Sequence, residues 1–334
     1  MKRKRLGAVL RADEGGLAAQ SISFSNQFPI DRALVVDVGN TRGVADASRL
    51  CALEVRVTDG LPNDDDVNWL IDKSDVIWSA ETFYNPMLVV WARAKQVRTV
   101  LTGNPELFQH KVPRPDVVTL PTAWQAHTVG GATVLQWPVD LADIAEAPRT
   151  HADKFVHVST SAMADREGTE IVKDAIAHMK EPAAWHVRLT ANYRPAKLVP
   201  SWVNLTSSYE MVADRKAIWP DDGDVYVVPR RYGGLSLLTQ EAAARGMAII
   251  HTDTMPYNFH PRGLLPTTDE APRVRMLGGH FRVQQASPTQ LADICDHLVS
   301  NPDLAAEMAK AAWDWAIRNS WPNLRTRWEQ VLGL

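Results

Sequence analysis

Short apolar runs alternate with amphipathic segments along the first half of the chain. Runs such as RLGAVLR (Arg5–Arg11) and DVIWSAE (Asp75–Glu81) end in turn or polar residues, as the buried strands of a sheet do. Segments with helical composition lie between such runs, and DDDVNWLIDK (Asp64–Lys73) has the acidic first turn that suits a helix N-terminus. This alternation predicts a doubly wound parallel sheet. We expect further strands at residues 33–39, 53–60, 115–124 and 132–140.

The second half repeats the alternation. Strands are predicted at Lys154–Ala162 and Ala183–Thr190, and from Thr169 apolar residues recur at helical spacing. Toward the end of the chain, residues 287–300 and 301–319 form two amphipathic patterns that predict helices.

The length of 334 residues allows two domains, each with its own core. Residues 141–153 lack apolar periodicity and are typical of a linker. We therefore expect an N-terminal domain at residues 1–150, a C-terminal domain at residues 151–310, and a last helical segment at residues 311–334.

The composition is that of an ordinary globular protein. Apolar residues make up 45% of the chain and charged residues 22%, and the net charge of -3 gives no general attraction to nucleic acid. Cys51 and Cys295 exclude a disulfide framework and lack metal-ligand spacing. No apolar run approaches the roughly 20 residues of a membrane span, and the basic start KRKR lacks the apolar stretch of a signal peptide. We expect a cytoplasmic protein.

The stretch from Asp224 to Asn258 organises the second half. DVYVV predicts a buried strand, PRRYGG a turn with two arginines, LSLLTQEAAARG a helix that ends at Gly246, and MAIIHTD a second strand. This order is one βαβ unit of a parallel sheet. The helix N-terminus at the carboxyl end of such a strand attracts phosphate, and PRRYGG lies at that point.

The same stretch resembles the donor-binding signature of GT-B glycosyltransferases, in the mostly retaining, nucleotide-sugar-dependent group 1 (family 4-like). That signature runs roughly D-V-x-V-x-P-S-R-x-E-G-x-x-x-x-x-x-x-E-A-x-A-x-G. Glu241, Ala242, Ala244 and Gly246 match it, whereas Gly233 stands where the first glutamate belongs. The form PRRYGGL resembles a phage and bacterial subset of the group.

The resemblance implies an α/β fold with two Rossmann-like domains that face each other across a cleft. It also implies that the last helical segment, residues 311–334, crosses back to the N-terminal domain. The implied reaction moves a sugar from a nucleoside diphosphate sugar, with a UDP-sugar favoured, to an acceptor hydroxyl with retention of configuration. The donor acts as a co-substrate, and neither a tightly bound cofactor nor a metal ion is required, because the D-x-D element of metal-dependent enzymes is missing from the predicted strand ends.

Relatives hold the donor diphosphate with an arginine and a lysine near the start of the C-terminal domain. Here Ser159 and Thr160 stand at the place of the arginine motif, and Glu167 replaces the lysine. Arg166 lies one position earlier and is a candidate phosphate ligand, with a solvated surface arginine as the alternative. Gly168 keeps its place and allows the backbone to approach the donor closely.

The PRRYGG turn supplies further candidates for the donor site. We expect at least one of Arg230 and Arg231 to contact phosphate, and the other can pair with an acidic residue, with Tyr232 beside them. Since a glycine at position 233 cannot act as an acid or base, the leaving diphosphate would take the proton of the acceptor while the protein positions the reactants and stabilises charge. Backbone N–H groups in this turn can bind sugar hydroxyls or phosphate: Gly233, Gly234 and Leu235.

Glu241 is the most specific single position. The resemblance implies that its carboxylate accepts hydrogen bonds from the two ribose hydroxyls, a task that suits a group with two acceptor oxygens. The alternative is an ordinary exposed helix glutamate.

Polar residues also follow predicted strands in the first half. Glu81 opens the loop ETFYN, and Glu106 closes the loop GNPE. A carboxylate at either place can hydrogen-bond a sugar hydroxyl, act as a base toward an acceptor, or cap a helix. We favour function for Glu81, because the similar subset also has an E-T-x-Y-N stretch, and capping for Glu106. Asp13 and Glu14, after the first strand, border the expected cleft or form a solvated turn.

Two other functions stay open. A sugar-nucleotide epimerase of the same fold would need additional acid–base residues, for which Glu81 and His110 are the candidates. A non-catalytic nucleotide- or glycan-binding homologue would account for Gly233 and the displaced Arg166. A transferase could act on a glycan, a protein or modified DNA, and KRKR and the tryptophans favour DNA only slightly.

Overall fold

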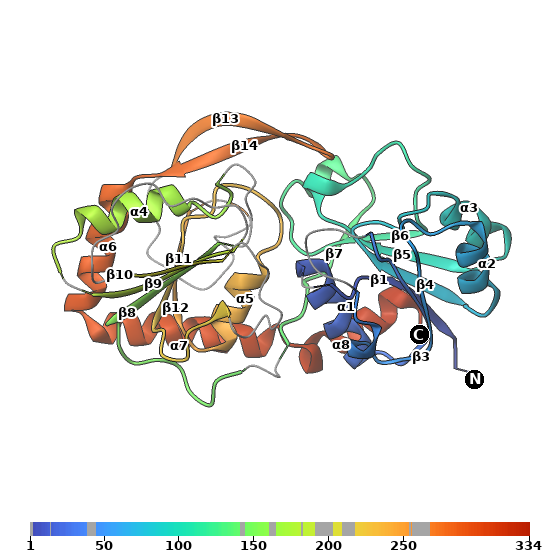
Figure 1. Ribbon diagram of the computed structural model, residues 1–334, viewed down its shortest axis with the longest axis horizontal. Coiled ribbons are helices and arrows are strands. Elements are labelled where there is room, and N and C mark those ends of the chain that lie inside the picture. Colours follow the sequence, from blue (N-terminus) through green and yellow to red (C-terminus); the bar gives the residue numbers. More distant parts are fainter. Residues whose placement is uncertain are drawn as a thin grey trace. The chain divides into compact units, whose positions relative to one another are not determined.

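The computed structural model describes residues 3–13, 15–38, 45–140, 144–159, 165–181, 183–190, 203–208, 218–253, 255 and 268–334. The chain divides into two compact units. Each unit has its own parallel sheet with helices packed on it (Figure 1). Unit 1 consists of Met1–Trp137, Met276–Gly279 and Leu324–Leu334, and unit 2 of Pro138–Arg275 and His280–Asn323.

Seven parallel strands form the sheet in the described part of unit 1, in the order β3-β2-β1-β4-β5-β6-β7. The strands are β1 (Leu6–Leu10), β2 (Ile30–Val35), β3 (Ala52–Val57), β4 (Val76–Ala80), β5 (Arg98–Thr102), β6 (Val117–Leu120) and β7 (Thr133–Val134). The helices are α1 (Gly16–Gln27), α2 (Asp64–Asp72), α3 (Met87–Ala94) and α8 (Trp321–Leu332), with 3-10 turns η1 (Ala47–Arg49), η2 (Pro105–Leu107) and η3 (Ala126–Thr128).

Local sequence explains most of these elements. All five residues of β1 are buried, as in a parallel strand covered on both faces. The helix predicted at residues 64–73 is α2, whose N-terminus is closed by a reciprocal capping box between Asn63 and Asp66. The strand predicted at residues 132–140 is much shorter in the structure, where β7 covers only Thr133–Val134. The strand predicted at residues 33–39 begins three residues earlier, at Ile30.

A cluster of aromatic rings lies in the core of unit 1. Phe24 of α1 stacks on Trp78 of β4, with ring centroids 3.8 Å apart. Trp328 of α8 packs edge-on against Trp137 at 5.2 Å, and its Nε1 donates a hydrogen bond to the Gln136 carbonyl oxygen at 3.3 Å. Trp328 is fully buried, so it packs in this core rather than forming an exposed platform for bases.

Five parallel strands form the sheet in the described part of unit 2, in the order β10-β9-β8-β11-β12 (Figure 1). The expected βαβ unit is present as β11, α5 and β12. The strands are β8 (Lys154–Ser159), β9 (Ala184–Thr190), β10 (Val203–Ser208), β11 (Val225–Val228) and β12 (Ala248–His251). The helices are α4 (Thr169–His178), α5 (Leu237–Ala244), α6 (Pro288–Ser300) and α7 (Pro302–Arg318).

A two-stranded sheet of β13 (Thr268–Met276) and β14 (Gly279–Ala286) was not predicted. Its sequence signal is Leu277-Gly278, a two-residue turn between two β-rich stretches. Gly278 packs within unit 1, where its N–H donates to the Glu106 carbonyl oxygen at 2.8 Å. A Cβ at this position would overlap the Pro105 carbonyl oxygen, so the turn requires glycine.

A buried histidine joins three elements of unit 2. His157 of β8 has its Nδ1 2.8 Å from the Val227 carbonyl oxygen and its Nε2 2.9 Å from the Thr169 hydroxyl. The carbonyl can only accept, so Nδ1 carries the proton and Nε2 accepts from the hydroxyl. Burial lowers the pKa of His157 from 6.5 to about 4, although the bond to Val227 opposes that shift. His157 is therefore neutral in the folded protein at neutral pH.

This depressed pKa predicts a loss of stability in mild acid. Between pH 6.5 and about 4 the unfolded chain binds a proton at His157 that the folded chain does not, so the free energy of unfolding falls as the pH falls through this window. The contribution of His157 reaches about 3 kcal/mol at the acid end. Chemical unfolding at a series of pH values gives the free energy of unfolding as a function of pH. This free energy should depend less steeply on pH in His157→Gln than in wild type. His178→Gln, at an exposed position of α4, should keep the wild-type pH dependence. Equal slopes for all three proteins would contradict the assignment.

Candidate active site

The strand order of each sheet reverses at one point. The reversal lies between β1 and β4 in unit 1, and between β8 and β11 in unit 2. In open parallel sheets, ligands bind beyond the carboxyl ends of the two strands that flank such a switch point. Glu81 directly follows β4, Ser159 is the last residue of β8, and Arg230 lies two residues after β11, so these three candidates lie at the switch points.

A buried ion pair connects the loops that follow β8 and β11. Arg230 Nη1 lies 3.7 Å from Glu167 Oε1, and both residues are almost completely buried. Ser159 Oγ lies 3.5 Å from Glu167 Oε2. Burial raises the pKa of the Glu167 carboxyl, while Arg230 and Arg166 oppose that shift. Glu167 is thus paired with an arginine from the neighbouring loop.

The two arginines of the PRRYGG turn have different partners. Arg230 donates from Nε to the Tyr232 carbonyl oxygen at 3.3 Å and from Nη2 to the Leu235 carbonyl oxygen at 2.9 Å, so it also holds the turn in shape. Arg231 Nη1 lies 3.8 Å from Asp165 Oδ2. Both arginines therefore lie beside a carboxylate, whereas the sequence predicts such a pair for one of them.

The guanidinium of Arg166 occupies the space where a side chain at position 233 would lie. Gly233 has a φ of 108°, and a Cβ built on it would overlap the guanidinium, whose Cζ would be 2.8 Å away. Arg166 Cζ also lies 5.5 Å from the centroid of the Tyr232 ring. A cation therefore lies where the glycosyltransferase signature that this stretch resembles has a carboxylate.

The first turn of α4 has a protein acceptor. Asp165 Oδ1 accepts a hydrogen bond from the N–H of Thr169 at 2.6 Å, and its Oδ2 lies 3.4 Å from the N–H of Glu170. Gly168 precedes this turn with a φ of 73°, and a Cβ there would overlap the Pro229 carbonyl oxygen. Because Asp165 already satisfies these amides, a phosphate in this cluster would depend on arginine side chains more than on the helix N-terminus.

Glu241 lies on α5, five residues after the capping residue Ser236, which corresponds to about 7 to 8 Å along the helix axis. Its Oε2 accepts a hydrogen bond from Trp219 Nε1 at 2.9 Å. Trp219 is buried and packs edge-on against Tyr226, with ring centroids 5.1 Å apart. Trp219 was not predicted from the sequence, although a buried indole N–H requires an acceptor. This bond fixes one oxygen of the Glu241 carboxylate.

Unit 1 has a second polar cluster at its switch point. Glu81 and Tyr84 have φ values of 61° and 62°, in the left-handed region that residues other than glycine rarely adopt. Asn104 donates from Nδ2 to Glu81 Oε1 at 2.9 Å. Arg11 pairs with Asp13 and lies 5.9 Å from the centroid of the Tyr84 ring. Burial raises the pKa of the Tyr84 hydroxyl, and Arg11 opposes that shift. Strained residues held by such networks are typical of functional sites.

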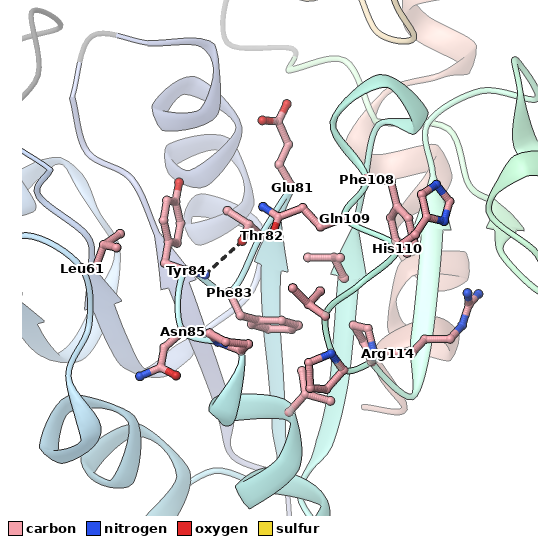
Figure 2. A pocket seen from close by; sticks show the side chains of 16 residues that line it. Leu61, Glu81, Thr82, Phe83, Tyr84, Asn85, Phe108, Gln109, His110 and Arg114 are labelled. Atoms are coloured by element: carbon pink, nitrogen blue, oxygen red, sulfur yellow. Dashed lines mark hydrogen bonds between the residues drawn. The ribbon is translucent and has the colours of Figure 1, made fainter. Parts of the chain in front are cut away.

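A pocket of about 440 Å³ adjoins this cluster in unit 1. Figure 2 shows Glu81, Thr82 and Tyr84 along one part of its lining and Phe108 and His110 along another, with the Phe83 ring between them. The sequence candidates Glu81 and His110 therefore line the same pocket. The remaining lining residues are Leu61, Asn85, Pro86, Val89, Leu101, Gln109, Val112, Pro113, Arg114 and Pro115.

Two further candidates from the sequence, Glu106 and Glu14, belong to unit 1. Glu106 is buried in the first turn of η2, and Glu14 lies outside the described residues. In the described ranges, no three His, Cys, Asp or Glu side chains are grouped as ligands for a metal ion. The same ranges contain no helix that is both long and apolar enough to cross a bilayer.

No protein-family profile matches the chain, and no curated protein matches it by sequence. Solved structures, however, match over nearly its whole length. A sucrose-phosphate synthase from Thermosynechococcus elongatus has a TM-score of 0.64 at 12% identity, over 98% of each chain. The Anabaena protein HepE, in complex with UDP-glucose, has a TM-score of 0.65 at 14% identity, over 99% of this chain and 100% of its own.

An alpha-glucosyltransferase in complex with UDP-glucose and DNA containing an abasic site is a further match. Its TM-score is 0.61 at 10% identity, over 99% of this chain and 100% of its own. At these identities the likeness concerns the fold alone. The chain has the α/β fold with parallel sheets of GT-B glycosyltransferases, as the sequence predicts.

The position of Arg166 predicts that Gly233→Ala is harmful for two separable reasons. The positive φ costs on the order of 1–3 kcal/mol for a residue with a side chain, and the new methyl group displaces the guanidinium. Gly60→Ala is the matched control, because Gly60 also has a positive φ, of 83°, but has nothing within 4 Å of a built Cβ. Thermal unfolding should show destabilisation in both variants, with the larger loss in Gly233→Ala, where the methyl group also displaces the guanidinium. Equal destabilisation of the two variants would show that the place of Arg166 does not matter for stability.

Proposed function

We propose that the protein is a glycosyltransferase that moves a sugar from a nucleoside diphosphate sugar to an acceptor hydroxyl with retention of configuration. The observation that carries this proposal is the cluster of Arg166, Arg230 and Arg231 at the switch point of the unit 2 sheet. Fixed cations at the carboxyl ends of parallel strands suit a diphosphate. Structures with the same fold were solved with UDP or UDP-glucose, which favours a UDP-sugar as the donor.

The donor site follows from the places of these side chains. Arg166 and Arg231 are at the outer part of the cluster and would contact the diphosphate, whereas the more buried Arg230 keeps the turn and Glu167 in place. Glu241, held by Trp219, would accept hydrogen bonds from the ribose hydroxyls. The backbone N–H groups of the Gly233–Leu235 stretch would face the sugar or the phosphate nearest to it.

The reaction needs no acid or base at position 233. The bond between the anomeric carbon and the diphosphate oxygen breaks, and the acceptor oxygen forms a bond to the same face of that carbon. The proton of the acceptor hydroxyl passes to the departing diphosphate oxygen, so charge and atoms balance. The arginines stabilise the negative charge that develops on the diphosphate. Glu81, oriented by Asn104, would hydrogen-bond an acceptor hydroxyl.

Two alternative functions are each supported by one observation. A non-catalytic nucleotide-binding homologue is favoured by the pairing of both turn arginines with carboxylates. A sugar-nucleotide epimerase is favoured by the presence of Glu81 and His110 in one pocket. Nucleotide binding without any turnover would support the first, and conversion of a UDP-sugar to its epimer without an acceptor would support the second.

A thermal-shift panel tests the donor site. UDP, GDP, ADP and their glucose derivatives are compared on wild type, Glu241→Ala and Glu307→Ala, where Glu307 is an exposed residue of α7. A ligand present at 100 times its dissociation constant should stabilise the protein by about 2.7 kcal/mol. We expect the uridine ligands to raise the melting temperature, with most of that shift lost only in Glu241→Ala. If no nucleotide shifts the folded wild type, the proposal fails.

The strained backbone of Glu81 predicts an uncoupling of stability from activity. Glu81→Gly releases backbone strain, on the order of 1 kcal/mol, and loses a hydrogen bond of similar value, so the free energy of unfolding should change little. Sugar transfer should fall at least about tenfold, a difference of 1.4 kcal/mol in activation free energy. Gln96→Gly releases similar strain, at a φ of 58°, outside the pocket lining and should keep full activity. Full transfer by Glu81→Gly would remove Glu81 from the mechanism.

A further inference from the structure

Four core side chains form the apolar part of the lining of the pocket in unit 1, which we call its floor. Phe83, Val89, Leu101 and Phe108 are each no more than 6% exposed and belong to the same hydrophobic cluster of unit 1. Its volume of about 440 Å³ lies in the range of pockets that hold small organic ligands. Since such pockets are lined mainly by apolar and aromatic groups with a few polar ones, the floor suits an apolar ring system.

The walls of the pocket are held by hydrogen bonds within unit 1. On one side, Asn85 donates from Nδ2 to the Pro62 carbonyl oxygen at 3.0 Å and accepts from the N–H of Met87 at 2.9 Å. On the other side, Arg93 donates to the Arg114 carbonyl oxygen at 2.8 Å, and the Arg114 side chain donates to the Gly130 carbonyl oxygen. A pocket with preformed walls loses little entropy when a ligand enters.

Glu81, Thr82 and Tyr84 place polar groups at one part of the lining, and Asn85, Gln109, His110 and Arg114 place others elsewhere along it. Figure 2 shows the Glu81 carboxylate and the Tyr84 hydroxyl pointing to the same side, away from the Phe83 ring. Asn104 holds the Glu81 carboxylate through Oε1 at 2.9 Å. A ligand with an apolar body and one hydroxyl group would therefore find a hydrogen-bond acceptor at the polar part and an apolar floor elsewhere.

We propose that this pocket binds the apolar ring system of a small acceptor molecule and directs its hydroxyl group to Glu81. The inference rests on the proposed sugar transfer only in calling this ligand an acceptor. Among the lining residues only Arg114 and His110 can carry positive charge, and Glu81 opposes them, so the pocket is not suited to the phosphates of DNA. A glycan acceptor would require more hydrogen-bonding groups than this floor offers.

Binding of three probes to the full chain tests the ligand class. 2-Naphthalenemethanol has a fused apolar ring and one hydroxyl group, methyl β-D-glucoside has hydroxyl groups without an apolar ring, and a short single-stranded oligonucleotide has phosphates. We expect naphthalenemethanol to bind with one-to-one stoichiometry in calorimetry and more tightly than the other two. Tighter binding of the glucoside would indicate a glycan acceptor, and tighter binding of the oligonucleotide would indicate a nucleic acid acceptor; either result overturns the proposal.

Substitutions at the rim locate the bound probe. Val112 lines the pocket and Val90 of α3 does not, and both are 39% exposed, so tryptophan at either position is compatible with folding. Val112→Trp should weaken naphthalenemethanol binding at least about tenfold, or 1.4 kcal/mol, while Val90→Trp keeps the wild-type affinity. Leu61 is a lining residue that is 64% exposed, and Leu61→Lys should also weaken naphthalenemethanol binding. This second variant keeps the test decisive if Val112→Trp does not fold. Unchanged binding in the folded rim variants overturns the proposal.

A separate measurement distinguishes this inference from the proposed function. UDP-glucose binding is measured on the same wild-type, Val112→Trp and Val90→Trp proteins. If none of them binds UDP-glucose but naphthalenemethanol binding depends on Val112, the sugar-transfer proposal fails and the pocket assignment stands. If all of them bind UDP-glucose but wild type does not bind naphthalenemethanol, the pocket assignment fails alone.

Discussion

The close approach of Gly168 to the carbonyl group of Pro229 underlies the polar cluster of unit 2. No side chain fits between the two backbones, because a Cβ at position 168 would overlap the carbonyl oxygen. The approach allows the N–H of Arg231 to donate to the Arg166 carbonyl oxygen at 2.9 Å. It also brings three arginines next to Glu167 and Asp165. The three cations can be held this close because the two carboxylates lie among them.

The architecture could be predicted from the sequence because strands, turns and helix ends are specified by residues close together in the chain. The βαβ unit from Asp224 onward carries both strand patterns, the breaker-rich turn and the helix stop in adjacent residues, and each of these has a local physical cause. The glycines at positions 168 and 233 were also visible in the sequence. The reason that these positions require glycine was not visible, because the Pro229 carbonyl group and the Arg166 guanidinium that leave no room for a side chain belong to other loops.

The details that escaped prediction depend on distant partners. Nothing in the local sequence indicates that Trp219 bonds to Glu241, or that Arg230 turns inward to Glu167. The positive φ values of Glu81 and Tyr84 are equally hidden, because glutamate and tyrosine have no preference for the left-handed region and only the surrounding packing imposes it. A functional site built from such features can be located from its strand ends, but its geometry has to be observed.

The aromatic cluster of unit 1 has a consequence for synthesis on the ribosome. Most of unit 1 lies before Pro138, yet its core includes Trp328, which is made about 190 residues after Trp137. At roughly 5–20 residues per second, the first unit waits on the order of 10–40 s for this ring, which packs against Phe24 and Trp137. Unit 2 is completed in between, so the half of the protein that is translated first is the last to finish folding.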